Sequence, residues 1–265
     1  MTNQALEQAL SIVKTAVTKS GEELIKHYGK IEADLKPDKE IGMANSVTKL
    51  DLQTENFLAE ELRKFDPTIS FHGEEYGKRS SSERKWLVDP IDGTSFFARG
   101  LPFCATMVAL IEADQVLLSV IYDFVNRDLY WAIKGQGAYK NQDRIFVSNR
   151  PLSRSLLSFE TQLNNPENLS SFLSVKKVAN TLYAMNSGFE FTMVASGKLD
   201  GRLAKNPYGS DWDYAPGALL VAEAGGIATN IGKTTYDYRN HDYLITNPVI
   251  HRELTEGANA LFPIV

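Results

Sequence analysis

The chain has 265 residues, of which 43% are hydrophobic and 23% charged. This composition is close to that of ordinary soluble globular proteins, and the length allows one large domain or two closely packed halves. A net charge of −5 provides no long-range positive field, so we expect no general binding to nucleic-acid polymers or anionic membranes. Cys104 is the only cysteine, which excludes an intrachain disulfide and a cysteine-rich metal site and fits a reducing cytoplasm.

The first third of the chain predicts two helices and a strand. Charged residues interrupt the N-terminal segment, which therefore lacks the apolar core of a signal peptide, and its apolar residues recur at helical spacing up to Gly29. We expect the resulting helix to pack on the protein's own core. A polar loop is predicted over residues 36–45, a second helix over 50–62 with Thr48 and Asp51 near its start, and a strand over 69–71.

The rest of the chain predicts strands and then a change of pattern. Strands are expected over residues 86–88, 106–111, 116–122 and 129–133, and a hairpin follows near 138–141. In the second half, strands over 156–159, 177–183, 201–203 and 227–229 alternate with helical stretches, one ending at Ser196 and one covering 215–224. This alternation predicts two closely packed α/β subdomains, residues 1–150 and 151–265.

Acidic residues concentrate where predicted strands end and where a predicted helix begins. These are the positions at which α/β proteins place ligands. Carboxylates that converge on one point repel each other unless cations neutralise them, and hard oxygen ligands favour Mg²⁺, Mn²⁺ or Ca²⁺ over Zn²⁺. The residues concerned are Glu74, Glu75, Asp89, Asp92, Asp211 and Asp213.

The segment from Asp89 to Thr94 can hold a cation and a phosphate side by side. Pro90 restricts the backbone so that Asp89 and Asp92 can turn toward one point, where the Ile91 carbonyl can join them. Gly93 lets an anion approach the main chain, and a helix that begins at Thr94 would offer free N–H groups to a phosphate. Taken alone, the same six residues also fit a surface turn with a helix cap.

Four sequence segments resemble the inositol monophosphatase family, and the resemblance covers nearly the whole length of the chain. WLVDPIDGTSFF (residues 86–97) is similar to the first family signature, and WDYAPG (212–217) with EAGG (223–226) is similar to the second. VTKLD (47–51) with Glu55, and GEE (73–75), match two shorter elements in the same order. The resemblance implies the αβαβα five-layer sandwich shared with fructose-1,6-bisphosphatases, and a magnesium-dependent, lithium-sensitive phosphatase.

The resemblance also implies a role for each residue of the site. Two or three Mg²⁺ ions, with Mn²⁺ as a possible substitute, would activate a water that attacks the phosphate in line. The first ion would be held by Glu74, Asp89 and the Ile91 carbonyl, the second by Asp89, Asp92 and Asp213, and a weaker third by Glu74. Thr94, paired with Asp51, would orient the attacking water, and the amides of Gly93 and Thr94 would bind phosphate oxygens.

The substrate is less determined than the reaction. A small sugar or polyol phosphate such as inositol 1-phosphate is expected, with Asn206 and Glu75 near it, although Asn206 stands where animal inositol enzymes have a glutamate. Histidinol phosphate, fructose 1,6-bisphosphate and 3′-phosphoadenosine 5′-phosphate are the alternatives. Arg202 and Lys205 could bind a second phosphate, but a solvated surface position is the simpler interpretation.

Two further expectations concern the class and assembly of the protein. A catalytically inactive binding protein on the same scaffold would have lost a metal carboxylate or Thr94, and every expected ligand is present. The resemblance suggests a homodimer. The histidines show no spacing typical of metal ligands and are expected to be structural or to lie at the surface.

Overall fold

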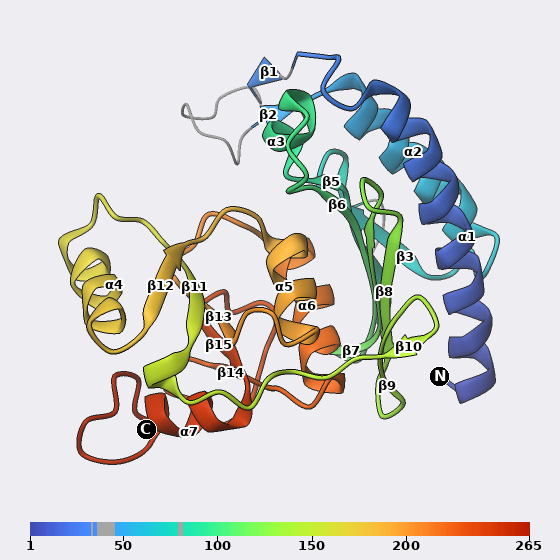
Figure 1. Cartoon of the computed structure of the whole chain (residues 1–265). Coiled ribbons are helices and arrows are strands. Elements are labelled where there is room, and N and C mark those ends of the chain that lie inside the picture. The colour runs from blue at the N-terminus through green and yellow to red at the C-terminus, as the bar shows by residue number, and fades with distance from the viewer. Residues whose placement is uncertain (33, 36–45, 79–81) are drawn as a thin grey trace.

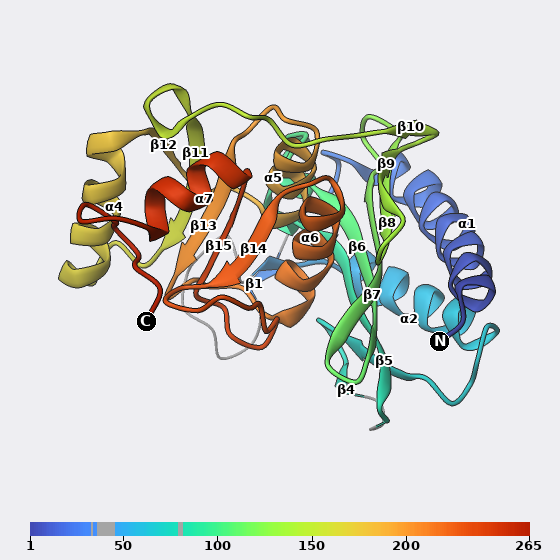
Figure 2. The same cartoon turned by 90° about the horizontal axis from the view of Figure 1, so that it is seen from below.

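Helices and sheets alternate in five layers in the computed structural model, which describes residues 1–32, 34–35, 46–78 and 82–265 (Figure 1). Helices α1 and α2 form the first layer, followed by an eight-stranded sheet, by α5 and α6, by a five-stranded sheet, and by α4 and α7 (Figures 1 and 2). The predicted αβαβα sandwich is therefore confirmed. The helices are α1 (Asn3–His27), α2 (Lys49–Arg63), α3 (Thr94–Arg99), α4 (Pro166–Val178), α5 (Ser187–Ala195), α6 (Asp211–Glu223) and α7 (Pro248–Thr255), with a 3₁₀ turn η2 (Leu152–Arg154).

The larger sheet has the strand order β10-β9-β8-β7-β6-β5-β3-β4. All its neighbouring strands are antiparallel except β3 and β5, which run parallel. One face packs on the apolar stripe of α1 and on α2, and the other packs on α5 and α6. Its strands are β3 (Ser70–Gly73), β4 (Gly77–Lys78), β5 (Arg84–Asp92), β6 (Ala105–Glu112), β7 (Gln115–Asp123), β8 (Asp128–Ile133), β9 (Gly137–Lys140) and β10 (Asp143–Arg144).

The smaller sheet has the strand order β12-β11-β13-β15-β14. Strands β12, β11 and β13 run parallel, whereas β15 is antiparallel to both of its neighbours. Its strands are β11 (Leu156–Thr161), β12 (Asn180–Tyr183), β13 (Gly201–Lys205), β14 (Ile227–Asn230) and β15 (Tyr243–Thr246), and a separate pair is formed by β1 (Asp34–Leu35) and β2 (Ser46–Val47). The predicted division near Pro151 lies between the two sheets, and its status as a subdomain boundary stays a prediction.

Helix α6 lies between the two sheets, and its side chains are apolar around most of its circumference, which allows both sheets to pack on it. Gly217 lies so close to α5 that a Cβ built on it would be 1.9 Å from Cδ2 of Phe191. Small residues along α6 therefore allow α5 and α6 to fit side by side in one thin layer. This layer brings the start of α6 toward the end of β5, where the acidic residues of both halves meet.

The structure corrects the predicted boundaries of two elements. The strand predicted over 177–183 begins only at Asn180, because α4 continues to Val178 with Val175 buried in the core. The helix predicted from Ala215 begins at Asp211, where Ser210 and Asp213 form a capping box. Strand β15 was not predicted from the sequence, and the loop predicted over residues 36–45 lies outside the described residues.

Candidate active site

The site is built on an irregular end of strand β5. The register with β6 shifts between Asp89 and Asp92, and the backbone N–H of Ile91 donates to Oδ1 of Asp89 at 3.0 Å. In a regular strand, residues three positions apart point to opposite faces of the sheet. The irregularity at Pro90 and Ile91 changes this alternation, so that Asp89 and Asp92 turn toward the same point.

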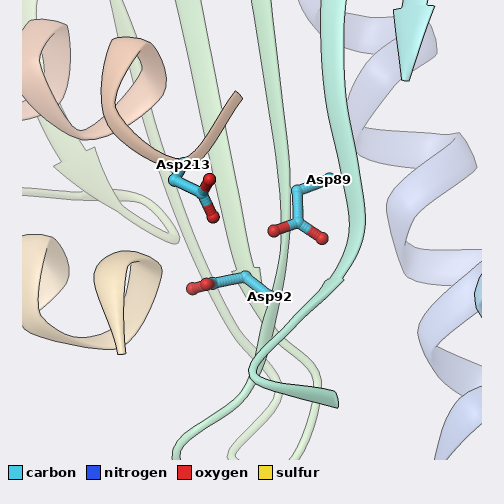
Figure 3. Close-up of side chains that lie close together, drawn as sticks. All are labelled: Asp89, Asp92 and Asp213. Carbon is cyan, nitrogen blue, oxygen red and sulfur yellow. The ribbon is translucent and has the colours of Figure 1, made fainter. Parts of the chain in front are cut away.

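Asp213, on the first turn of α6, completes a cluster of three carboxylates. Oxygen atoms of Asp89, Asp92 and Asp213 lie within 4.8 Å of one another, and the three side chains point toward a common space (Figure 3). Asp89 and Asp92 are buried, whereas Asp213 is partly exposed. The sequence motifs from the two halves of the chain therefore meet at one point.

The three carboxylates oppose each other's ionisation. Burial raises the pKa of Asp89 well above its usual value, and the charges of Glu74, Asp92 and Asp213 raise it further. Burial also raises the pKa of Asp92 to about 7, although the Gly188 N–H and the Arg202 charge act in the opposite direction. The pKa of Asp213 rises for the same reasons, first burial and then the charges of Glu74 and Asp92. The donor set thus fits a hard divalent cation, whose charge would allow all three groups to ionise.

Glu74 and Glu75 lie in the turn that follows β3. The backbone N–H of Glu74 donates to the Val88 carbonyl on β5 at 3.1 Å, which places this residue beside the cluster. The buried carboxylate of Glu55 holds the turn, since it accepts hydrogen bonds from the backbone N–H groups of Glu75 at 2.7 Å and Tyr76 at 3.0 Å. Helix α2 therefore positions both predicted glutamates, although the roles of Glu74 as a ligand and of Glu75 near substrate stay predictions.

Thr94 connects the end of β5 to helix α2. Its hydroxyl lies 2.8 Å from Oδ1 of Asp51 and 3.0 Å from the carbonyl oxygen of Ile91. Burial raises the pKa of Asp51 to about 6, and the hydrogen bonds from Thr48 and Thr94 limit this increase. The structure thus brings Thr94, Asp51 and the Ile91 carbonyl together, in an arrangement that can accept and hold a proton next to the carboxylates.

Gly93 must be a glycine for two reasons. Its φ of +85° lies in the left-handed region, and a Cβ built on it would be 2.4 Å from the Phe103 carbonyl oxygen and 2.6 Å from Nδ2 of Asn186. The backbone turns sharply here into α3, so the amides of Gly93 and Thr94 lie directly beside Asp92. Their predicted contact with phosphate oxygens is compatible with this position and stays a prediction.

Gly188 and Asn186, which hold Asp92 from the other side, are not among the residues predicted from the sequence. The backbone N–H of Gly188 donates to Oδ2 of Asp92 at 2.5 Å, and Asn186 caps α5 by accepting from the Phe189 N–H at 3.0 Å. Asn-Ser-Gly at a helix start is a capping signal that could have been found in the sequence. Nothing in it could show that the cap faces a carboxylate from the other half of the chain.

Arg202 and Lys205, for which binding of a second phosphate was the alternative to a solvated surface position, both pair with glutamates in the structure. Arg202 is fully enclosed, with ion pairs to Glu160 at 2.7 Å and Glu190 at 3.0 Å, so its assignment to a solvated surface is wrong. Lys205 pairs with Glu167 on α4 at 2.8 Å, on the outer side of the smaller sheet. Asn206 follows β13, where its N–H donates to Asp242 at 2.6 Å, and its contact with substrate stays a prediction.

The four histidines differ in their surroundings. His72 and His251 are buried, and His251 lies 2.9 Å from the Thr229 hydroxyl. His27 lies near Glu23 at the end of α1, and His241 pairs with Asp211 at 2.9 Å. Across the described parts of the chain, the group of residues whose geometry could hold a metal consists of carboxylates alone.

Comparison with known proteins agrees with this geometry. The model of the inositol monophosphatase family matches residues 5–264. An inositol-1-monophosphatase from Rhizobium meliloti is 32% identical over 232 residues, covering 83% of this chain and 85% of that protein. A fructose-1,6-bisphosphatase/inositol-1-monophosphatase from Aquifex aeolicus is 29% identical over 255 residues and covers 93% of both chains.

A solved structure gives the same result for the fold. The inositol monophosphatase of Thermotoga maritima superposes with a TM-score of 0.81 at 26% sequence identity, covering 93% of this chain and 94% of that one. In the described part of this chain, no helix combines the length and apolar character needed to cross a membrane. The family match over almost the entire chain, together with the shared fold, shows that this protein belongs to the inositol monophosphatase family of phosphatases.

Proposed function

We propose that the protein is a magnesium-dependent phosphomonoesterase that hydrolyses a small sugar or polyol phosphate such as inositol 1-phosphate. The observation that carries this proposal is the cluster of Asp89, Asp92 and Asp213, within 4.8 Å of one another, beside the hydrogen-bonded pair of Thr94 and Asp51. Three carboxylates in this arrangement are suited to hold divalent cations, and the adjacent hydroxyl is suited to orient water.

The positions of the three clustered carboxylates and of Thr94 support the proposed roles. Two or three bound Mg²⁺ ions, or Mn²⁺ in their place, would neutralise phosphate charge and make water a nucleophile near neutral pH. Glu74, Asp89, Asp92, Asp213 and the Ile91 carbonyl would hold these ions. Asp51 would accept a hydrogen bond from Thr94, whose hydroxyl oxygen then faces the attacking water in a defined orientation.

Phosphate and substrate would bind next to these ligands. The amides of Gly93 and Thr94 would donate to phosphate oxygens, which suits the turn of the backbone at Gly93. Asn206 and Glu75 are proposed to face the alcohol part of the substrate. An amide at position 206 can both donate to and accept from a sugar hydroxyl, so a polyol remains the preferred substrate class. We also expect inhibition by Li⁺, a cytoplasmic location and a homodimer.

Phosphate release from a panel of esters tests this proposal. The panel contains inositol 1-phosphate, histidinol phosphate, fructose 1,6-bisphosphate and 3′-phosphoadenosine 5′-phosphate, each measured with Mg²⁺, with chelator and with added Li⁺. We expect release that requires Mg²⁺, with the highest kcat/KM for inositol 1-phosphate. A different best substrate would replace the proposed one and leave the reaction class unchanged.

Failure of all four esters would contradict the proposed substrate class. Asp92→Asn provides the matched control, because it removes one charge from the cluster with almost no change in shape. If the unchanged protein and Asp92→Asn released phosphate at the same rate, the assignment of this cluster to metal binding would be wrong.

A further inference from the structure

A buried arginine lies behind the carboxylate cluster and has no role in the proposed reaction. Arg202 on β13 is 1% exposed and points into the layer of α5 and α6. Its Nε donates to Glu190 at 3.0 Å, and its Nη2 donates to Glu160 at 2.7 Å and to the Ser187 hydroxyl at 3.0 Å. The donors of a guanidinium lie in one plane, so Arg202 links its own strand β13 to β11 and α5 in a fixed geometry.

The first connection leads from Arg202 to Asp92. Ser187, which accepts the bond from Nη2, is the first residue of α5, and the next residue, Gly188, donates its N–H to Oδ2 of Asp92 at 2.5 Å. A Cβ on Gly188 would be 2.8 Å from the same oxygen, so the backbone of α5 lies directly against this carboxylate. Any movement of the start of α5 would therefore move Asp92.

The second connection leads from Arg202 to Asp213. The carboxylate of Glu160 also accepts from the Tyr214 hydroxyl at 3.1 Å and from the Tyr208 N–H at 2.9 Å. Tyr214 adjoins Asp213, and its hydroxyl accepts from the Gly209 N–H at 2.7 Å. Glu160, held by Arg202, therefore holds the segment that leads into α6 and presents Asp213.

We propose that Arg202 is a positioning residue that sets the spacing between Asp92 and Asp213 and thereby the affinity of the site for divalent cations. The inference rests on the proposed function, in which these carboxylates bind Mg²⁺. Three carboxylates this close repel one another, and each would move away unless its backbone were held. Arg202 holds the backbone on both sides of the cluster through contacts that do not touch the cation, and such supporting contacts commonly tune metal affinity.

Direct titration of the purified protein with Mg²⁺ by calorimetry, and with Mn²⁺ by electron paramagnetic resonance, tests this inference. We expect Arg202→Met to weaken the Kd for both ions by roughly 10- to 100-fold. Ser187→Ala removes one hydrogen bond of the network with little change in volume, and we expect a weakening of about threefold to tenfold. Thermal unfolding of each variant shows that the measurements are made on folded protein, and Ser187→Ala serves as the test if Arg202→Met does not fold.

Arg150 provides a matched control at the opposite end of the same helix. It pairs with Asp200 at 2.8 Å and donates to the Gly197 carbonyl at 2.7 Å, just after the end of α5. Arg150→Met should lower the thermal stability and leave the Kd for Mg²⁺ unchanged. Arg202→Lys keeps the positive charge but loses the planar set of guanidinium donors, so its affinity for Mg²⁺ should remain below that of the unchanged protein.

Three results would overturn the inference. Wild-type Kd values in folded Arg202→Met or Ser187→Ala would show that the network has only a structural role. Full affinity in Arg202→Lys together with a loss in Arg202→Met would assign the effect to charge and not to position. Absence of Mg²⁺ and Mn²⁺ binding to the unchanged protein would instead refute the proposed function, and with it the basis of this inference.

Discussion

The hydroxyl of Thr94 lies 2.8 Å from Oδ1 of Asp51, which joins two buried residues that are 43 positions apart in the chain. The other oxygen of Asp51 accepts from the N–H and the hydroxyl of Thr48 in the capping box of α2. One carboxylate therefore both starts a helix and orients a side chain at the end of β5. Because α2 is anchored in the core, Thr94 is held by a rigid element, as a group that orients water must be.

Replacement of Thr94 by valine tests this role. Thr94→Val keeps the shape and removes the hydroxyl, so we expect kcat to fall by roughly 100-fold or more, with a Kd for Mg²⁺ close to that of the unchanged protein. Steady-state phosphate release and calorimetry provide the two values. Thr255→Val is the control, because Thr255 is equally buried and its hydroxyl bonds to the His251 carbonyl on the remote helix α7. Equal kcat values for Thr94→Val and Thr255→Val would contradict the role.

The stability of the metal-free protein should depend on pH through the buried carboxylates. The pKa values of Asp51 and Asp92 are raised from 3.8 to about 6 and about 7, so the fold favours their protonated forms. Their contribution to stability is fully present at low pH and is lost as the pH rises through these values. In chelator, we expect the Tm to decrease from about pH 4, near the unfolded pKa of these groups, to about pH 7, whereas Mg²⁺ should stabilise the protein increasingly as the pH rises toward 7.

The difference between the Tm with Mg²⁺ and the Tm with chelator isolates this effect. Burial lowers the pKa of His251, which makes stability rise with pH in both conditions and therefore cancels in the difference. Differential scanning fluorimetry across the pH range measures both curves. In Asp92→Asn, the pH-dependent stabilisation by Mg²⁺ should be strongly reduced. A difference that does not vary with pH in the unchanged protein would show that the cluster is not the site of cation binding.

Because α5 packs closely against α6, we expect a single methyl group added at Gly217 to destabilise the protein. In Gly217→Ala, the new Cβ would be 1.9 Å from the Phe191 ring, and we expect a loss of roughly 1–3 kcal/mol in the free energy of unfolding. Phe191→Leu makes room at the same point, so the double variant should be more stable than the sum of the two single effects implies. Urea unfolding of the four proteins measures the coupling, and strict additivity would show that the two helices can move apart freely.

The edge of the smaller sheet is the surface on which the proposed homodimer would form. Strand β12 lies at this edge beside α4 (Figure 1). Both elements, and the residues just after β12, carry exposed large apolar side chains. These side chains are Leu169, Leu173, Val178, Leu182, Tyr183 and Met185. A second copy is suited to cover such a surface, since contiguous apolar patches on soluble proteins commonly mark interfaces.

Sedimentation velocity tests this assembly. We expect a dimer for the unchanged protein and a monomer for the double variant Leu173→Lys with Leu182→Lys. In a dimer of this variant, each copy would bury two charged lysines against the other copy. Tyr76→Lys changes an equally exposed aromatic residue far from this edge and should leave the dimer intact. A monomeric unchanged protein would exclude the dimer, and a dimeric double variant would place the interface elsewhere.

The sequence by itself determined the local elements and the types of residue available to the site. Apolar periodicity predicted α1, α2 and the strands β5 to β8, and carboxylates next to Pro90 and Gly93 predicted a cation and phosphate site at the end of one strand. The helices and strands are found where they were predicted because helix periodicity and turn residues are properties of short segments. The cation and phosphate site stays a prediction, supported by the carboxylates that meet there. Boundaries at α4 and α6 were misplaced where tertiary packing and a capping box extended the helices.

Only the tertiary structure decided which distant residues support the cluster. Arg202 in the sequence is compatible with the surface of a strand, and nothing near it indicates Glu160, Glu190 or Ser187 as partners. Similarly, the contact of Gly188 with Asp92 joins residues 96 positions apart. Such contacts depend on how the two sheets enclose α5 and α6, and this arrangement results from the burial of apolar surface over the whole chain, which no local pattern records.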